Sequence, residues 1–204
     1  MDNVEKLAKL FSYFPGIGER QSRRFVYFLL SSDPTYVREL SALISEIKKN
    51  VTRCSYCFRY YEANGETICN VCADPKTDKT TLLVVDKDAD FESMRKSKSY
   101  KGFYFVLGGL VPLVEKEMFK TVRVNELKAR IEKEAKEGVL KEIILAFSSS
   151  TLGDHTDMYL REVLFPITDQ KNIKVTSLGR GLSTGTELEY SDSETLKHAI
   201  NNRQ

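Results

Sequence analysis

The 204-residue chain has no tryptophan, only two histidines and four cysteines, and almost no net charge. Its 31 basic and 29 acidic side chains leave a formal charge of +2, which is too small to indicate a nucleic acid or a membrane surface as a partner. No apolar stretch approaches the roughly 18 residues of a membrane span. A nucleic-acid site must therefore come from a local arrangement of residues.

The composition supports a substantial core in a reducing environment. Hydrophobic residues make up 41% of the chain, and its length suits one large domain or two to three small ones. The opening MDNVEKLAKLF contains no apolar run that resembles a signal peptide, so we expect the thiols to stay reduced. The sequence also lacks the Gly-x-x-x-x-Gly-Lys-Ser/Thr pattern, which argues against a P-loop nucleotide site.

The four cysteines form two pairs, Cys54-x-x-Cys57 and Cys69-x-x-Cys72, with eleven residues between the pairs. Each pair can turn two sulfurs toward one point, and two such pairs complete a tetrahedral thiolate shell for Zn2+. Four protein ligands leave no open position for water, so we expect one structural zinc ion that does no chemistry. The alternative is a pair of disulfides in a secreted domain, which the expected reducing compartment disfavours.

The beginning of the chain is predicted to be helical. Apolar residues at helical spacing in residues 4–11 and 21–30 flank a turn with the sequence FPGIG at residues 14–18. Two helices around a Pro-Gly-Ile-Gly turn are the pattern of the helix-hairpin-helix. In that motif, Gly16 and Gly18 allow backbone N–H groups to approach a phosphate closely.

Three arginines lie in the first turn expected for the second helix, where the helix dipole disfavours cations. Arg20, Arg23 and Arg24 therefore predict an external anion, such as the phosphates of DNA, which would be bound without regard to base sequence. The alternative is an ordinary pair of helices whose arginines are merely solvated. A third helix is expected to follow, with Asp33 as its N-cap and Pro34 as its first residue.

After the cysteine loop, short apolar runs alternate with helical patterns. The runs predict buried strands at residues 81–86, 102–107, 142–147 and 173–178. Helices are expected between them, at residues 91–96, 124–135 and 157–169. This alternation predicts a small parallel sheet covered by helices, whose sites lie at the carboxyl ends of the strands. Two of these ends carry acids, Asp86 and Asp154.

In order and spacing, these motifs resemble the RecR family of bacterial recombination mediators over nearly the whole chain. The resemblance rests on the hairpin turn, the four-cysteine loop, the strand that ends with Asp86, YKGFYFVLGG at residues 100–109, EIILA at 142–146 and GTELEYSD at 185–192. It implies a multi-domain α+β fold. The expected parts are a helix-hairpin-helix domain (1–52), a four-cysteine zinc finger (53–76), a Toprim domain (77–178) and a carboxyl-terminal segment (179–204).

The resemblance also implies a role and partners. RecR-like proteins are not known as enzymes. With a RecO-like protein, and in many bacteria a RecF-like one, they load a RecA-like recombinase onto single-stranded DNA at gaps. They form ring-like tetramers or dimers around DNA. We therefore expect a cytoplasmic, nucleoid-associated homo-oligomer that binds single-stranded, double-stranded or gapped DNA. Residues 110–121 depart from the family pattern, so partner contacts mapped to that segment do not transfer.

Carried over residue by residue, the DNA contacts of the family fall on Arg20 and Arg24, and its zinc ligands fall on the four cysteines. Glu19 stands where the family usually has proline, and it adds an acid beside the hairpin surface. The glutamate that usually follows the first Toprim strand is Asp86 here. The usual acid-Gly-acid is Leu152-Gly153-Asp154, so one carboxylate is missing.

Two other classes of function are alternatives. A Toprim nuclease, primase or topoisomerase would use carboxylate-bound Mg2+ for phosphoryl transfer, and such an ion needs several converging acids. Asp86 and Asp154 alone are few, and an Asp at a strand end commonly caps the next helix, so Mg2+ is a weak expectation. A scaffold that binds only proteins would keep the cysteine loop but would need no arginines at the hairpin turn.

Overall fold

The computed structural model describes residues 1–113, 122–179, 182, 185, 187–191 and 193–201. The chain divides into two compact units, Met1–Thr52 and Arg53–Gln204. Most of the segment that departs from the family pattern, residues 114–121, lies outside the described residues. Within the described ranges, no helix combines the length and the apolar character needed to cross a membrane.

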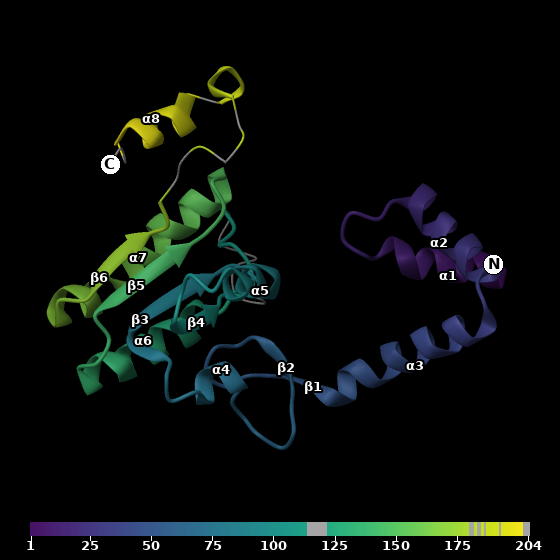
Figure 1. The fold of residues 1–204 in the computed structure, drawn as a ribbon, viewed down its shortest axis with the longest axis horizontal. Helices are drawn as coiled ribbons and strands as arrows, with labels where there is room; N and C mark the ends of the chain where they lie inside the picture. The colour runs from purple at the N-terminus through teal and green to yellow at the C-terminus, as the bar shows by residue number, and fades with distance from the viewer. Residues whose placement is uncertain (114–121, 180–181, 183–184, 186, 192, 202–204) are drawn as a thin grey trace. The chain divides into compact units, whose positions relative to one another are not determined.

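The first unit consists of three helices, which are α1 (Asn3–Ser12), α2 (Glu19–Ser31) and α3 (Pro34–Asn50) (Figure 1). Ala8 of α1 and Val26 of α2 are buried, and the ring of Phe11 meets that of Phe25 edge-on at 5.7 Å between centroids. Asp33 caps α3 as predicted, because its carboxylate accepts the N–H of Thr35 at 2.7 Å. No residue of α3 is buried.

The second unit opens with the cysteine loop and continues into a four-stranded sheet. A two-stranded sheet, β1 (Val51–Arg53) with β2 (Tyr60–Glu62), and the short helix α4 (Asn70–Ala73) frame the loop. The larger sheet has the order β4-β3-β5-β6, and all its neighbouring strands are parallel (Figure 1). Its strands are β3 (Asp78–Val85), β4 (Gly102–Val106), β5 (Glu142–Ala146) and β6 (Lys174–Ser177). The predicted α+β fold with a parallel sheet is confirmed.

Helices connect the strands and cover both faces of the sheet. They are α5 (Asp88–Ser97), α6 (Val124–Glu137) and α7 (Thr151–Lys171), followed by a short 3-10 helix, η2 (Leu188–Tyr190), and by α8 (Ser193–Asn201). Leu82 and Val84 of β3 pack in the cluster that contains residues of α6 and α7, whereas Leu83 and Val85 pack with Phe91 of α5. Burial on both faces explains why this strand is a continuous apolar run.

One predicted boundary is wrong by six residues, whereas the other predicted helices and strands begin within three residues of the expected positions. The helix expected to begin at residue 157 begins at Thr151, because Ser150 caps it and accepts the N–H of Gly153 at 3.2 Å. Asp154 therefore lies in the first turn of α7 and not directly at a strand end. The first turn carries little apolar periodicity, so its helical character could not be recognised from the pattern.

The start of α7 also fixes the residue type at Gly153. A Cβ atom there would collide with the backbone oxygen of Ser148, and this backbone atom cannot move aside cheaply. Alanine normally stabilises a helix interior relative to glycine, but overpacking costs about 1–3 kcal/mol. We expect Gly153→Ala to lower the free energy of unfolding, measured in urea. Gly179→Ala is the control, because its Cβ meets no atom within 4 Å. Equal midpoints for both variants would contradict this packing.

Candidate functional site

The four cysteine sulfurs gather at one point of the loop between β1 and β3. All four Sγ atoms lie within 4.8 Å of one another, and those of Cys57 and Cys69 are 3.7 Å apart. In a tetrahedral shell with metal–sulfur bonds of about 2.3 Å, neighbouring sulfurs would be about 3.8 Å apart. Three of the cysteines are fully buried, and Cys72 is half-buried. The cluster can therefore hold a tetrahedral metal ion.

The loop backbone turns its N–H groups toward the sulfur of Cys54. The N–H groups of Tyr56, Cys57 and Cys69 lie 3.4, 3.5 and 3.3 Å from this sulfur. A hydrogen bond from the thiol of Cys57 is the main cause that lowers the pKa of Cys54 to about 5, whereas the hydrogen bonds among the thiols raise the pKa of Cys57 and Cys72. The pKa of Cys69 is lowered too, first by a hydrogen bond from Cys54. Donors around a ligand of this kind favour the thiolate that metals bind.

A buried cation lies beside the cluster. Arg59 is only 7% exposed, donates from Nη2 to Asn70 Oδ1 at 2.7 Å, and stacks over Phe91 of α5 at 4.9 Å. Its Nε has no hydrogen-bond partner among the described residues, and its guanidinium helps to lower the pKa of Cys69. Four thiolates around a divalent ion carry a net negative charge. Arg59 also pairs with Glu92 at 3.6 Å, and a metal-filled cluster would add to the compensation of this buried charge.

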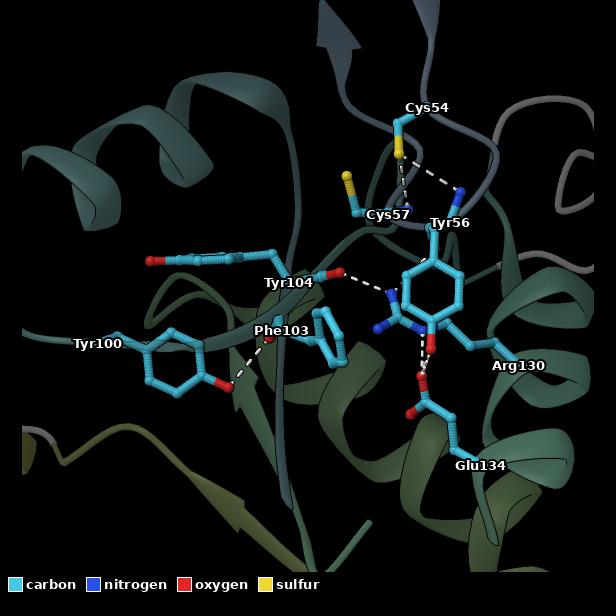
Figure 2. Close-up of polar contacts among 8 residues, drawn as sticks. All are labelled: Cys54, Tyr56, Cys57, Tyr100, Phe103, Tyr104, Arg130 and Glu134. Carbon is cyan, nitrogen blue, oxygen red and sulfur yellow. Dashed lines mark hydrogen bonds and ion pairs between the residues drawn. The ribbon is translucent and has the colours of Figure 1, made fainter. Parts of the chain in front are cut away.

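A second buried group ties the cysteine loop to α6 (Figure 2). Arg130 donates from Nη1 to the backbone oxygens of Tyr56 and Tyr104 at 2.9 and 2.8 Å, and from Nε to Glu134 at 2.8 Å. The hydroxyl of Tyr56 donates to the same Glu134 oxygen at 2.5 Å, and its ring lies 3.9 Å from the guanidinium. Tyr56, one of the two residues between Cys54 and Cys57, is thus joined to the sheet and to α6.

This group is nearly dry. Arg130 is 7% exposed and Glu134 is 5% exposed, while burial and the hydrogen bond to Glu134 raise the pKa of Tyr56. The N–H of Val106 in β4 also donates to the backbone oxygen of Cys57 at 2.8 Å. Sequence reasoning missed this group, since an Arg and a Glu four residues apart on a helix usually form a solvated pair. The sequence feature that could have indicated this buried group is the tyrosine within Cys54-x-x-Cys57.

The two glycines of the hairpin turn differ in backbone conformation. Gly16 has φ of +77°, which favours glycine, whereas Gly18 is extended and serves as the N-cap of α2. Among the described residues, no side chain accepts a hydrogen bond at this end of α2. Both glycines are exposed, and a Cβ atom at either would meet nothing within 4 Å. The backbone is therefore open to a ligand here.

All three hairpin arginines are exposed on α2. Because the helix begins at Glu19, Arg20 is in the first turn, while Arg23 and Arg24 lie one turn later than expected. Arg23 lines a groove of about 490 Å3 between α1 and α2, together with the acids Glu5 and Glu19. The basic side chain of Lys9 also lines this groove, whereas Arg20 and Arg24 do not.

The two candidate Toprim acids lie near the carboxyl edge of the sheet. Asp86 directly follows β3 and is half-buried, and its backbone oxygen accepts the N–H groups of Gly108 and Gly109 at 2.8 and 3.2 Å. Burial, followed by the charge of Asp90, raises the pKa of Asp86. Asp154 is half-buried in the first turn of α7. This edge includes the ends of β3 and β5, where the strand order reverses and ligands of such sheets commonly bind.

Neighbouring acids have structural partners. Asp88 accepts the N–H of Tyr60 at 2.8 Å, and Asp157 pairs with Arg161 at 2.5 Å. In the part of the chain that the structure describes, the cysteines form the only group of three or more potential metal ligands. Within that part, Asp86 and Asp154 belong to no such group.

The Toprim domain family matches residues 80–179, which include most of the parallel sheet, so this is a Toprim-containing protein. The family described as RecR, C-terminal, matches residues 181–204. The chain is 34% identical to the recombination protein RecR of Dehalococcoides mccartyi, covering 98% of this chain and 93% of that protein. It is 32% identical to the RecR of Acidothermus cellulolyticus, covering 100% and 94%. The chain belongs to the RecR family, as the motifs predicted.

The buried group around Arg130 generates a stability prediction. Removing one partner of a buried ion pair leaves an uncompensated charge, so Arg130→Met should lower the free energy of unfolding by about 3–5 kcal/mol. Tyr56→Phe removes one hydrogen bond and should cost about 1–3 kcal/mol. Combining the two changes should cost less than their sum, because both side chains contact Glu134. Urea unfolding of metal-loaded protein measures all three. Strict additivity would show that the two interactions are independent.

Proposed function

We propose that this protein is a non-enzymatic mediator of recombination in DNA repair that binds DNA without sequence preference. The observation that carries the proposal is the set of three exposed arginines, Arg20, Arg23 and Arg24, beside the open N-terminal end of α2. Membership of a family whose relatives are named recombination protein RecR supports the same role.

In the proposed complex, the hairpin binds the DNA backbone. Unpaired N–H groups at a helix N-terminus attract phosphate, and the turn at Gly16 and Gly18 presents no side chain that would keep the backbone away. Arg20 and Arg24, together with the exposed Arg23 on the same helix, would neutralise neighbouring phosphates. Contacts of this kind fix position on DNA but read no bases, which accounts for binding without sequence preference.

We assign Cys54, Cys57, Cys69 and Cys72 as the ligands of one zinc ion. Four sulfurs at tetrahedral spacing suit zinc, and a shell closed by four protein ligands leaves no position for a reacting water. When bound, zinc supplies structure only. The chain's own residues then fix the loop against the sheet, through Arg130 on one side and Arg59 on the other.

The remaining partners are proposed from the family and from two surfaces. The exposed apolar side chains of α3, Leu43, Ile44 and Ile47, are 57%, 60% and 58% exposed, which supports a homo-oligomer such as a ring-like tetramer or dimer. The sheet edge with Asp86 and Asp154 is proposed to face a RecO-like protein. With a RecF-like protein where one exists, the complex would load a RecA-like recombinase onto single-stranded DNA at gaps.

Catalysis by a Toprim enzyme is less well supported. Phosphoryl transfer through Mg2+ needs several oxygen ligands around one ion. Among the described residues, no group of three acids converges near Asp86 or Asp154, and Asp88 and Asp157 have structural partners. DNA should therefore be recovered intact after incubation with the protein and Mg2+.

Removal of one cysteine ligand should unfold the loop. Structural zinc supplies on the order of 10 kcal/mol of apparent binding free energy at neutral pH. We expect one zinc per wild-type chain by elemental mass spectrometry, and less in Cys54→Ser and Cys69→Ser. Both variants should be cut by trypsin within the loop, whereas the exposed control Ser55→Ala should resist. Metal-free wild-type protein with an equally resistant loop would refute the assignment.

Removal of the hairpin arginines should weaken DNA binding and its salt dependence. Each phosphate that an arginine neutralises releases counterions, so Arg20→Ala with Arg24→Ala should flatten the plot of log affinity against log salt by about one unit for each arginine–phosphate pair removed. Lys48→Ala with Lys49→Ala is the control, because it removes the same charge from exposed positions of the same unit. Unchanged affinity and slope in the arginine variant, at matched solution mass, would favour a scaffold that binds only proteins.

A further inference from the structure

The exposed side of α2 carries an aromatic residue in line with the arginines. Arg20, Arg23, Arg24 and Tyr27 occupy positions i, i+3, i+4 and i+7, which fall within about 100° of arc on a helix. All four residues are exposed, and Tyr27 is 60% exposed. The opposite side of α2 holds the buried Ser22 and Val26, so this stripe faces away from the interior of the unit.

Tyr27 differs from the other aromatic residues of the hairpin. The rings of Phe11, Phe14, Phe25, Phe28 and Tyr36 take part in edge-on aromatic pairs. Tyr13 is also exposed, but it lines the groove between α1 and α2 with Glu5 and Glu19. Among the described residues, Tyr27 takes part in no aromatic pair, and it is the aromatic side chain that continues the arginine stripe.

We propose that Tyr27 is a stacking platform for a base of single-stranded DNA. The inference rests on the proposed DNA-binding role of the hairpin and adds a preference for DNA form. A strand whose phosphates lie along Arg20 and Arg24 would pass Tyr27 about 10 Å from the start of the stripe. An unpaired base can stack there, whereas the bases of a duplex stay stacked within the helix. Every base has an aromatic face, so this contact also reads no sequence.

The charge of the stripe favours DNA over a protein partner. Arg23 and Arg24 precede Tyr27 by four and three residues on the same side of α2, and Arg20 lies one turn before Arg24. The nearby acid Glu19 lines the groove on the α1 side with Arg23. A polyanion with flat aromatic groups complements both features of this surface. A basic groove with aromatic side chains is the usual construction of proteins that bind single strands.

The test compares Tyr27→Ala with Tyr27→Phe on oligo(dT) and on duplex DNA. Tyr27→Ala should bind the single strand on the order of tenfold more weakly, with duplex binding and salt slope nearly unchanged, because stacking on one aromatic ring has about this effect. Tyr27→Phe keeps the ring and should bind both forms as the wild type does. Tyr190→Ala removes another highly exposed tyrosine and should change neither. A 2-aminopurine base in the strand should be quenched by wild type and by Tyr27→Phe, but less by Tyr27→Ala.

Equally weakened binding to single and double strands, or an effect of Tyr27→Phe as large as that of Tyr27→Ala, would overturn stacking. A changed solution mass in Tyr27→Ala would instead place this residue in a subunit contact and would also overturn it. The variant Arg20→Ala with Arg24→Ala distinguishes the hypothesis of DNA binding by the hairpin from the hypothesis of base stacking on Tyr27. If Arg20→Ala with Arg24→Ala leaves all DNA binding intact, the hairpin role itself fails. If that variant no longer binds while Tyr27→Ala binds single strands as tightly as the wild type, only the stacking proposal fails.

Discussion

The guanidinium of Arg130 is the contact on which the arrangement of the second unit depends. It reaches from α6 to the backbone oxygen of Tyr56 in the cysteine loop and to that of Tyr104 in β4. A buried ion pair such as Arg130 with Glu134 adds little net stability, because desolvation offsets most of the attraction. Its directional hydrogen bonds nevertheless allow only one placement of the loop on the sheet. The cysteines thus bring the loop together around one point, and the hydrogen bonds of Arg130 hold that loop on the sheet.

The net charge of the chain is small, but the charged side chains of its two units have different roles. Acids near the carboxyl edge of the sheet make structural contacts: Asp88 accepts a hydrogen bond from the backbone of Tyr60 in β2, and Asp157 pairs with Arg161. On the hairpin, three arginines are left exposed beside an open helix end. Local arrangement, and not overall charge, therefore determines what each surface attracts. Asp86 stands apart because burial raises its pKa although no acid cluster surrounds it among the described residues.

The features set by local chemistry could be predicted from the sequence, and those set by distant contacts could not. The strands β3 and β4 were predicted within a few residues because burial on both faces leaves continuous apolar runs. The strand predicted at residues 173–178 is present as β6, but it lies at the sheet edge and none of its residues is buried. Asp33 with Pro34 fixed the start of α3. The early start of α7 was missed because Ser150 caps a turn with little apolar periodicity. The roles of Arg59 and Arg130 were missed because each charge is buried by residues far away in the chain. A charged residue is expected at the surface until the residues that cover it are known.

The proposed DNA contacts would also favour the proposed assembly of copies into an oligomer. One hairpin would neutralise only two or three phosphates, and non-specific binding through so few contacts is weak at physiological salt. Several hairpins that meet one DNA molecule would add their contacts, because each later contact forms at a high effective concentration. The apolar side chains of α3, directly after the hairpin, leave a surface through which copies could join. On this view, the exposed Leu43, Ile44 and Ile47 contribute to DNA binding indirectly, since subunit association would combine several weak contacts into one complex of higher affinity.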